Sequence, residues 1–290
     1  MRQHAVVLTY PGHFLLTALT IQSVQEYFPE VKDITVLVDD ISDRAWPTYV
    51  QDCEQLYKCS VIALSTFDRF RKFRGNPWVR QQVVKLYLDE VLPWQEWFFV
   101  DGDVVFYFGV DKNIVPYTLV PYSGVPLSDR DPKPGETTSQ QLYYVQYLLG
   151  IKTDGLWHDG PEGYKRVCAS GAPFRDMQAQ TLKDLRSYIE QRLHQPFDDI
   201  HLALSSDTRH SVSEWELIET FRTTIQHKQL DLRFYPPYNI LDILPHKEYV
   251  RPLPFFKTCY CSDTELGEQW WNQQALSIPN NIWSILPKKK

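Results

Sequence analysis

Two aspartates separated by one glycine, Asp101 and Asp103, have the spacing in this sequence that best suits chemistry. They follow the apolar run 97–100, and side chains at positions i and i+2 of an extended chain point the same way. Both carboxylates can therefore converge at the carboxyl end of a buried strand, where open α/β sheets bind ligands, and Gly102 lets backbone or ligand approach closely. Neighbouring carboxylates repel unless a cation intervenes, and Mg²⁺ or Mn²⁺ prefers such oxygen ligands with substrate phosphates completing the shell. The pair predicts a divalent metal site, with an ordinary strand-to-turn junction as the alternative.

The elements that must position this pair alternate between strand and helix patterns. Short apolar or β-branched runs predict strands at 5–9, 33–39, 60–64 and 97–101. Helices are expected at 14–28, 45–57, 78–92, 175–193 and 213–227, and a long loop at 121–140. This alternation indicates an α/β fold with a mostly parallel central sheet flanked by helices. We expect one globule, in which residues 1–120 form a nucleotide-binding half and residues 121–290 complete the cleft.

Composition narrows the classes of protein. The chain has 290 residues, of which 43% are hydrophobic and 23% charged, with a net charge of −6. These values exclude disordered and repeat-array proteins, and the acidic balance argues against a broad nucleic-acid surface. Five widely spread cysteines give no disulfide framework. No run approaches the roughly 18 apolar residues of a membrane span, and no signal peptide is evident, so we expect a cytoplasmic protein without a transmembrane segment.

Two cations of the expected helix 78–92 bear on the aspartate pair. On a helical wheel Arg80 shares the inward arc of Val83 and Val84, and counting back along the helix places it near the level of the aspartates. An inward arginine needs an anion, and a diphosphate or the two aspartates would serve. Lys85 falls on the opposite arc, where a solvated lysine is an equally good interpretation. A basic cluster just upstream could grip phosphate or be solvated; it comprises Arg69, Arg71, Lys72 and Arg74.

Taken in order, these segments resemble glycosyltransferases of the GT-A architecture, a single Rossmann-like domain, and are similar to poorly characterised bacterial and phage members. The likeness covers roughly residues 4–225. It rests on the aspartate pair and on the segments 5–10, 36–40, 78–86, 168–174 and 213–217. The resemblance implies transfer of a sugar from a UDP- or GDP-sugar to a hydroxyl acceptor, with Mn²⁺ or Mg²⁺ as cofactor. The acceptor stays open among a glycan, a lipid and a modified nucleobase in DNA.

The resemblance also implies roles for individual residues. Asp103 would ligate the metal, and Asp101 would face the donor and reach the metal through water. Donor contacts would come from Thr9, Tyr10, Asp40, Arg80, Gln81, Lys85, Asp101 and Gly102. The third metal ligand would be His246, with His210 and His201 as rivals. The acceptor would meet Ser170, Gly171 and Trp215, beside a wall formed by the small-residue segment 168–174.

The start of the expected helix 213–227 carries two candidate bases. An inverting transfer needs a carboxylate to deprotonate the acceptor hydroxyl, and Glu214 and Glu216 lie just after Ser213, a plausible N-cap. Acids in a first helical turn also simply favour the helix dipole. By the resemblance Glu214 is preferred over Glu216 as the catalytic residue.

Two other classes of protein remain open. A phosphatase of the HAD type would use Asp101 as nucleophile and Asp103 as acid and base. That scheme normally places the pair near the N-terminus with a hydroxyl residue just after it, whereas Val104 follows here. A non-catalytic carbohydrate- or nucleotide-binding module would keep the aromatic surfaces and would need no metal.

Overall fold

A computed structural model of the chain describes residues 4–10, 13–41, 54, 59–73, 77–102, 104–106, 114–121, 144–151, 157–160, 163–168, 174–207, 213–229, 231–234 and 255–257. Almost all of the helix expected at 45–57 and of the loop expected at 121–140 lies outside these residues. The same is true of Asp103.

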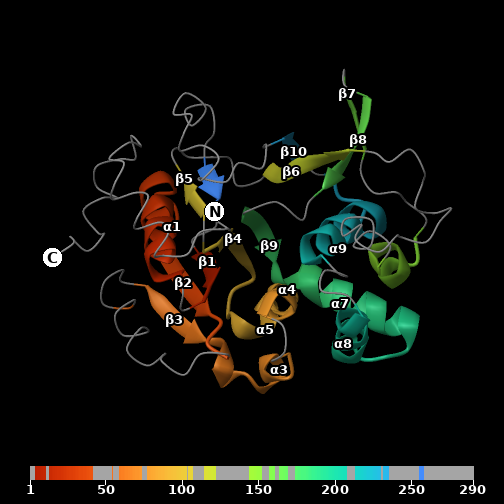
Figure 1. Cartoon of the computed structure of the whole chain (residues 1–290), viewed down its shortest axis with the longest axis horizontal. Coiled ribbons are helices and arrows are strands. Elements are labelled where there is room, and N and C mark those ends of the chain that lie inside the picture. The colour runs from red at the N-terminus through yellow and green to blue at the C-terminus, as the bar shows by residue number, and fades with distance from the viewer. Residues whose placement is uncertain are drawn as a thin grey trace.

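Five strands form the main sheet in the spatial order β3-β2-β1-β4-β9 (Figure 1). Their bounds are β1 His4–Thr9, β2 Asp33–Val38, β3 Ser60–Ala63, β4 Glu96–Asp101 and β9 Phe174–Gln178. The first four run parallel, and β9 is antiparallel to β4. The α/β class with a mostly parallel central sheet is therefore confirmed. Because the chain builds β2 and β3 on one side of β1 and returns to β4 on the other, the topological switch point lies between β1 and β4.

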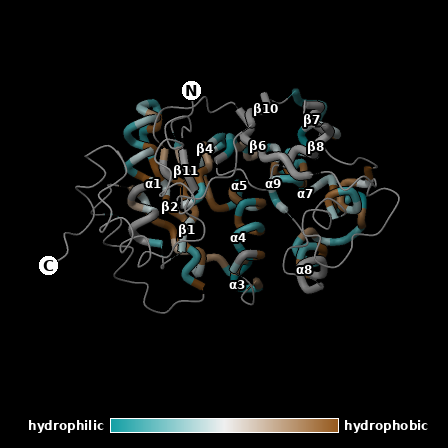
Figure 2. The backbone as a smooth tube through the Cα atoms, turned by 45° about the horizontal axis from the view of Figure 1, so that its top comes forward, coloured by the Kyte–Doolittle hydropathy of each residue, from teal (hydrophilic) through white to brown (hydrophobic). Residues whose placement is uncertain are grey.

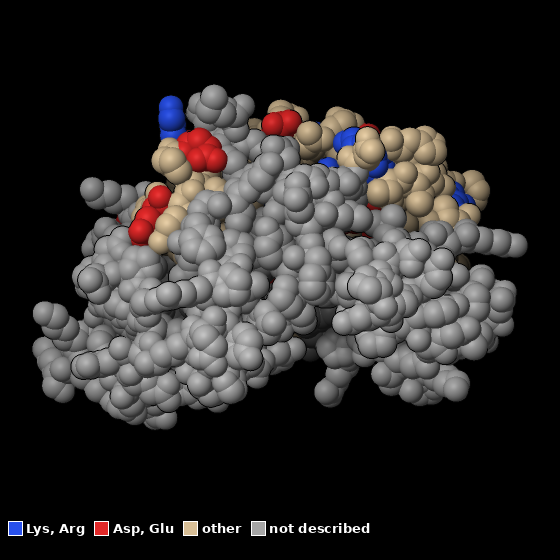
Figure 3. Space-filling model, turned by 90° about the horizontal axis from the view of Figure 1, so that it is seen from above, with Lys and Arg blue, Asp and Glu red and all other residues tan. Residues whose placement is uncertain are grey.

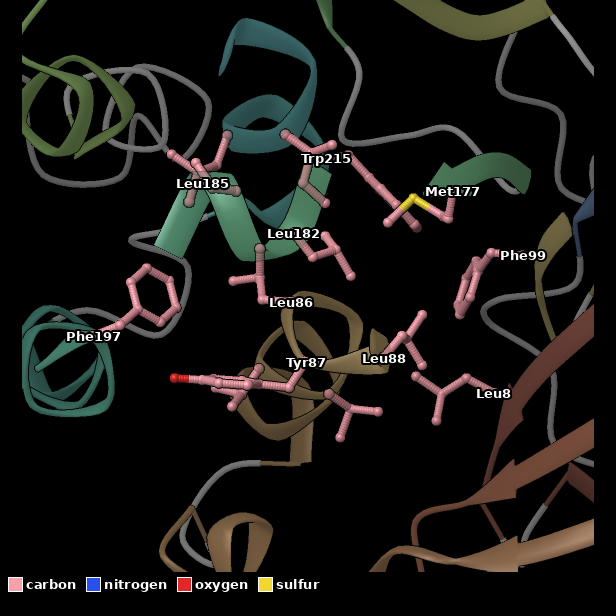
Figure 4. Close-up of a cluster of buried hydrophobic side chains, with 14 of the residues drawn as sticks. Leu8, Leu86, Tyr87, Leu88, Phe99, Met177, Leu182, Leu185, Phe197 and Trp215 are labelled. Atoms are coloured by element: carbon pink, nitrogen blue, oxygen red, sulfur yellow. The ribbon is translucent and has the colours of Figure 1, made fainter. Parts of the chain in front are cut away.

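Alternating side chains give each face of the sheet its own core. Ala5 and Val7 pack with helix α1 (Phe14–Tyr27) on one face, whereas Val6 and Leu8 belong to the cluster on the other face. That second face is covered by α4 (Pro77–Leu86), α5 (Leu88–Val91), α7 (Ala179–Leu193) and α9 (Glu214–Thr220). Figure 4 shows part of this cluster between the strands and these helices. Hydrophobic residues run through the central strands, while α4 carries hydrophilic residues as well (Figure 2).

The remaining elements surround this sheet. A second sheet has the order β10-β6-β8-β7, and β11 pairs with β5. The strands are β5 Val104–Phe106, β6 Ile114–Pro121, β7 Trp157–Gly160, β8 Gly163–Cys168, β10 Asp231–Phe234 and β11 Phe255–Lys257. The further helices are α3 Asp68–Arg71, α8 Phe197–Asp207, a 3-10 turn at Leu64–Thr66 and a π turn at Phe221–Ile225. Within the described ranges, no helix is long and apolar enough to cross a membrane.

Tertiary contacts change two of the expected helices. The helix expected at 78–92 is interrupted at Tyr87 and forms two helices, α4 and α5. At the interruption, the carbonyl of Leu86 accepts a hydrogen bond from Arg186 Nη1. The helix expected at 175–193 starts at Ala179, because the residues before it form strand β9 on the edge of the sheet. A pattern of period 3.6 cannot reveal that a short preceding segment pairs with β4.

Candidate functional site

Acidic side chains gather where the parallel strands end. Leu37 and Phe99 belong to the core beneath α4, so the residues two positions later, Asp39 and Asp101, face the same side of the sheet. β1 lies between the two strands concerned, and its Leu8 is paired with Asp101. At the carboxyl edge of the sheet, Asp39 and Asp101 therefore both face α4, and β1 lies between them.

Gly102 fixes the spacing of β1 and β4 at this edge. Its backbone N–H donates to the carbonyl of Leu8 over 2.9 Å. A Cβ at this position would lie 2.7 Å from that oxygen and 2.9 Å from Thr9 Cβ, closer than side-chain atoms normally approach. The close approach expected at Gly102 is therefore made by the backbone of β1.

Arg80 is buried and pairs with Asp39. Its Nε lies 2.6 Å from Asp39 Oδ1, and its Nη1 donates to the carbonyl of Phe73 over 3.0 Å. The two side chains are 1% and 0% exposed. Burial raises the pKa of Asp39, and the hydrogen bond and charge of Arg80 oppose that rise. Arg80 points inward as expected, and among the described residues it forms an ion pair with Asp39.

The register of the strands agrees with the expected level of Arg80, because Leu37 and Asp101 both pair with Leu8 and Asp39 lies two positions further along the chain from Leu37. The helix that carries Arg80 is nevertheless shorter than expected, since α4 ends at Leu86 and α5 begins at Leu88. Further along α4, Lys85 contacts Asp101.

Lys85 lies between two carboxylates from distant parts of the chain. Its Nζ is 2.8 Å from Glu214 Oε1 and 3.1 Å from Asp101 Oδ1. The ammonium also lies 4.9 Å from the ring centroid of Trp215 and 5.2 Å from that of Phe99. The lysine side chain is only 8% exposed, so the solvated interpretation is wrong. The outer arc of α4 is covered because α9 packs against it.

A second group of buried charges lies along α9 and β9. Arg175 Nε is 3.4 Å from Glu219 Oε1, and Arg222 Nη1 is 3.0 Å from the other oxygen of that carboxylate. Burial lowers the pKa of Arg175 to about 10, and the charge of Glu219 opposes the fall. The Arg175 guanidinium lies 5.4 Å from the Trp215 ring, so the indole contacts two cations, Lys85 and Arg175.

Trp215 is an interior side chain. It is 1% exposed and packs at an angle against Phe99, with ring centroids 5.2 Å apart. Figure 4 shows it among the buried side chains between α7, α9 and the sheet. Its predicted acceptor contact remains a prediction, and in this structure the indole packs against Phe99 and the Lys85 ammonium. The N-cap expected at Ser213 is confirmed, since its hydroxyl accepts from the backbone N–H of Glu216.

Three predicted donor contacts lie at the ends of β1 and β2. Asp40 accepts hydrogen bonds from the backbone N–H of Ser65, over 2.8 Å, and from the Ser65 hydroxyl. The Thr9 hydroxyl lies 2.5 Å from that of Thr17 on α1. Tyr10 is 39% exposed, and its hydroxyl bonds to Nε2 of His13. Of these three side chains, Tyr10 offers the largest surface to a ligand.

The described members of the basic cluster are paired with acids. Arg69 contacts Glu90 over 2.7 Å, and Arg69 and Lys72 each lie 3.6 Å from Asp198. Arg71 contacts Asp68 over 2.9 Å. Figure 3 shows the side of the molecule away from α3, and there too the described charged residues are of both signs. These pairs favour the structural interpretation of the cluster over phosphate binding.

Metal binding is predicted at residues that are largely outside the described ranges. Asp103, His246 and the rival His210 all fall there, as do the acceptor candidates Ser170 and Gly171. Among the residues that the structure describes, no three His, Cys, Asp or Glu side chains form a group that could hold a metal ion. The other rival, His201, is 1% exposed on α8, where its ring packs against Phe73 and Phe197. Gln81, also a predicted donor contact, is half-buried on α4.

Comparisons with known proteins identify distant structural similarity. No family model matches the sequence, and no curated protein matches it. Among solved structures, the apo form of mouse xyloside xylosyltransferase 1 is similar with a TM-score of 0.38 and 10% identity, over 81% of this chain and 85% of that one. The apo bifunctional glycosyltransferase WbbM has a TM-score of 0.41 and 10% identity, over 98% of this chain and 51% of its own. The glycosyltransferase GlyE of Streptococcus pneumoniae TIGR4 has a TM-score of 0.39 and 12% identity, over 100% of this chain and 61% of its own.

Proposed function

We propose that this protein transfers a sugar from a nucleotide-diphosphate sugar, UDP- or GDP-linked, to a hydroxyl acceptor. The observation that carries the proposal is the position of Asp101. It ends β4 beside the switch point of a parallel sheet, where α/β proteins bind nucleotides, and its side chain remains 15% exposed. Through Lys85 it is connected to Glu214, a carboxylate suited to act on the acceptor.

A divalent ion fits the charge of this edge. The three side chains in contact, Lys85, Asp101 and Glu214, carry one positive and two negative charges, and the predicted ligand Asp103 adds a further negative charge. Mg²⁺ and Mn²⁺ are commonly held by one or two carboxylates while substrate phosphates complete the shell, so Asp101 and Asp103 would hold the ion, with His246 as the proposed third ligand. When bound, the ion would neutralise charge on the departing diphosphate.

Glu214 is the proposed general base of an inverting transfer, with Glu216 as the alternative. Its Oε1 accepts from Lys85, which leaves Oε2 as the oxygen to take the proton of the acceptor hydroxyl. A base held in this way needs no rearrangement before the proton moves.

Tyr10 is proposed to stack on the nucleobase of the donor. It directly follows β1, and its ring lies 3.8 Å from the ring of His13, centroid to centroid. That contact and the hydroxyl–imidazole bond orient the ring before any ligand arrives, which lowers the entropy cost of stacking.

One observation also favours a second candidate, the phosphatase. The Lys85 ammonium lies 3.1 Å from Asp101, and a cation beside an aspartyl nucleophile would stabilise an incoming phosphoryl group. The two candidates differ in their substrate. The phosphatase would hydrolyse a phosphomonoester, whereas the transferase would release a nucleoside diphosphate from a nucleotide sugar.

The test is a nucleotide-release assay. A panel of UDP- and GDP-sugars is incubated with the protein and Mn²⁺, and release of UDP or GDP is measured. Asp101→Asn should lower the rate by about 100-fold or more. The matched control is Asp33→Asn at the opposite end of β2, where the aspartate is 62% exposed and the rate should not change. Hydrolysis of p-nitrophenyl phosphate without nucleotide release would support the phosphatase instead.

A further inference from the structure

The ammonium of Lys85 connects the two sides of the proposed site. Asp101 lies at the end of β4, where the donor is proposed to bind, and Glu214 begins α9, which carries the proposed base. Both contact the same nitrogen atom, at 3.1 and 2.8 Å. Lys85 and Glu214 are separated by 129 positions in the sequence, so this contact exists only in the folded chain.

The lysine is held by the same two elements that carry its acidic partners. Phe99, two residues before Asp101, presents its ring 5.2 Å from the ammonium. Trp215, the residue after Glu214, presents its ring at 4.9 Å. Two carboxylates and two aromatic faces therefore surround one cation, and both kinds of contact attract it. The position of the ammonium depends on β4 and α9 together.

Without the Lys85 ammonium, the Glu214 carboxylate would be free to change its orientation. Two largely buried carboxylates within about 6 Å of each other repel, and a glutamate side chain can relieve that repulsion by changing rotamer. The contact to Lys85 removes this freedom, because it holds Oε1 and leaves Oε2 turned away from the ammonium. A ligand that takes over Asp101 would leave the contact between Lys85 and Glu214 in place.

We propose that Lys85 is a positioning residue, which holds the Glu214 carboxylate at a fixed position relative to Asp101 on the donor side of the site. This inference rests on the proposed function, because it assigns Glu214 a catalytic task. Lys85 acts through Glu214 and not on the reacting atoms. Its removal should therefore slow the chemical step much more than it weakens donor binding, on which Lys85 bears through its contact with Asp101.

The test is a double-mutant cycle on nucleotide-sugar turnover, with Lys85→Met, Glu214→Gln and the combined variant. Both substitutions nearly preserve side-chain volume while removing charge. Lys85→Met alone should lower kcat by about 30-fold or more, with KM for the nucleotide sugar changed by less than about 3-fold. In the Glu214→Gln background the same substitution should cost less than about 3-fold, because the residue through which Lys85 acts is already disabled.

Three further measurements separate positioning from a merely structural role. Lys85→Arg keeps the charge and should retain more activity than Lys85→Met. Lys32→Met, at an exposed position before β2, is the matched control and should behave as the wild type. Thermal unfolding of each variant shows whether it folds. If Lys85→Met does not fold, Lys85→Gln, which removes the charge but can still donate to Glu214, replaces it in the cycle; its loss should be smaller and should again disappear in the Glu214→Gln background.

The outcomes distinguish this inference from the function on which it rests. If the wild type is active and the losses in kcat of Lys85→Met and Glu214→Gln simply add in the combined variant, the positioning role would be overturned and the transferase proposal would stay intact. A fully active Lys85→Met variant would have the same consequence. A wild-type protein that consumes no nucleotide sugar would overturn the proposed function, and the positioning role with it.

Discussion

Replacing Arg80 by methionine should destabilise the protein strongly through the carboxylate that it leaves behind. The Arg80 and Asp39 side chains are almost wholly buried, 2.6 Å apart, and Arg80 also bonds to the carbonyl of Phe73. Arg80→Met would leave Asp39 buried without a counter-ion. Breaking such a pair by removing one partner typically costs about 3–5 kcal/mol, because the remaining charge stays desolvated.

This loss corresponds to a measurable change in melting temperature. An unfolding entropy of about 2.1 cal/mol/K per residue gives about 0.6 kcal/mol/K for 290 residues. Arg80→Met should therefore lower the Tm by about 5–8 °C in differential scanning calorimetry. Adding Asp39→Asn removes the orphaned charge, and the double variant should recover more than half of the loss.

The matched control is Arg71→Met. Arg71 makes a comparable contact to Asp68, but both side chains are exposed, and exposed pairs contribute about 0–1 kcal/mol. If Arg80→Met were no more destabilising than Arg71→Met, or were not improved by Asp39→Asn, the structural role assigned to Arg80 would be refuted. Loss of UDP or GDP binding at unchanged Tm would instead identify Arg80 as a donor contact.

Two further predictions concern stability. Gly102→Ala places a Cβ 2.7 Å from the Leu8 carbonyl oxygen and should cost about 1–3 kcal/mol in urea unfolding; an unchanged midpoint would show that β1 and β4 separate freely. His201 has its pKa lowered by burial from 6.5 to about 4, so its neutral form stabilises the fold fully above pH 6.5 and this contribution is lost as the pH falls toward 4. The free energy of unfolding of the wild type should fall by about 3 kcal/mol from this group between pH 6.5 and pH 4. The His201→Leu variant should show a correspondingly smaller fall over the same pH range, and equal falls in the two proteins would contradict the role assigned to His201.

The sequence was sufficient for the parallel part of the fold because each strand has its own apolar run. Strands β1, β2, β3 and β4 all lie where those runs predict them, to within one or two residues at their ends. β9 was missed because its pattern merges with that of the helix that follows. Whether a short segment pairs with β4 depends on a partner about 80 residues away in the sequence, and local periodicity carries no such information.

The sequence identified acidic residues of the candidate site, but not the cations with which each of them pairs. Asp101 and Glu214, both singled out from the sequence, lie beside one buried cation in the structure, and their roles in catalysis and binding stay predictions. The helical wheel correctly placed Arg80 on the arc that faces the sheet. For Lys85, on the opposite arc, the interpretation of a solvated side chain was wrong, because it assumes that a helix has only one covered face. Here the sheet covers one side of α4 and α9 the other, so both cations are buried.

The central claim is that a nucleoside diphosphate binds at the carboxyl edge beside Asp101. The most direct measurement is anomalous diffraction at the manganese edge from crystals soaked with Mn²⁺ and UDP or GDP. We predict a manganese peak within coordination distance of the Asp101–Asp103 pair, with the nucleotide lying over the ends of β1 and β4. A nucleotide bound elsewhere, or a diphosphate at this edge with no manganese beside it, would contradict the claim.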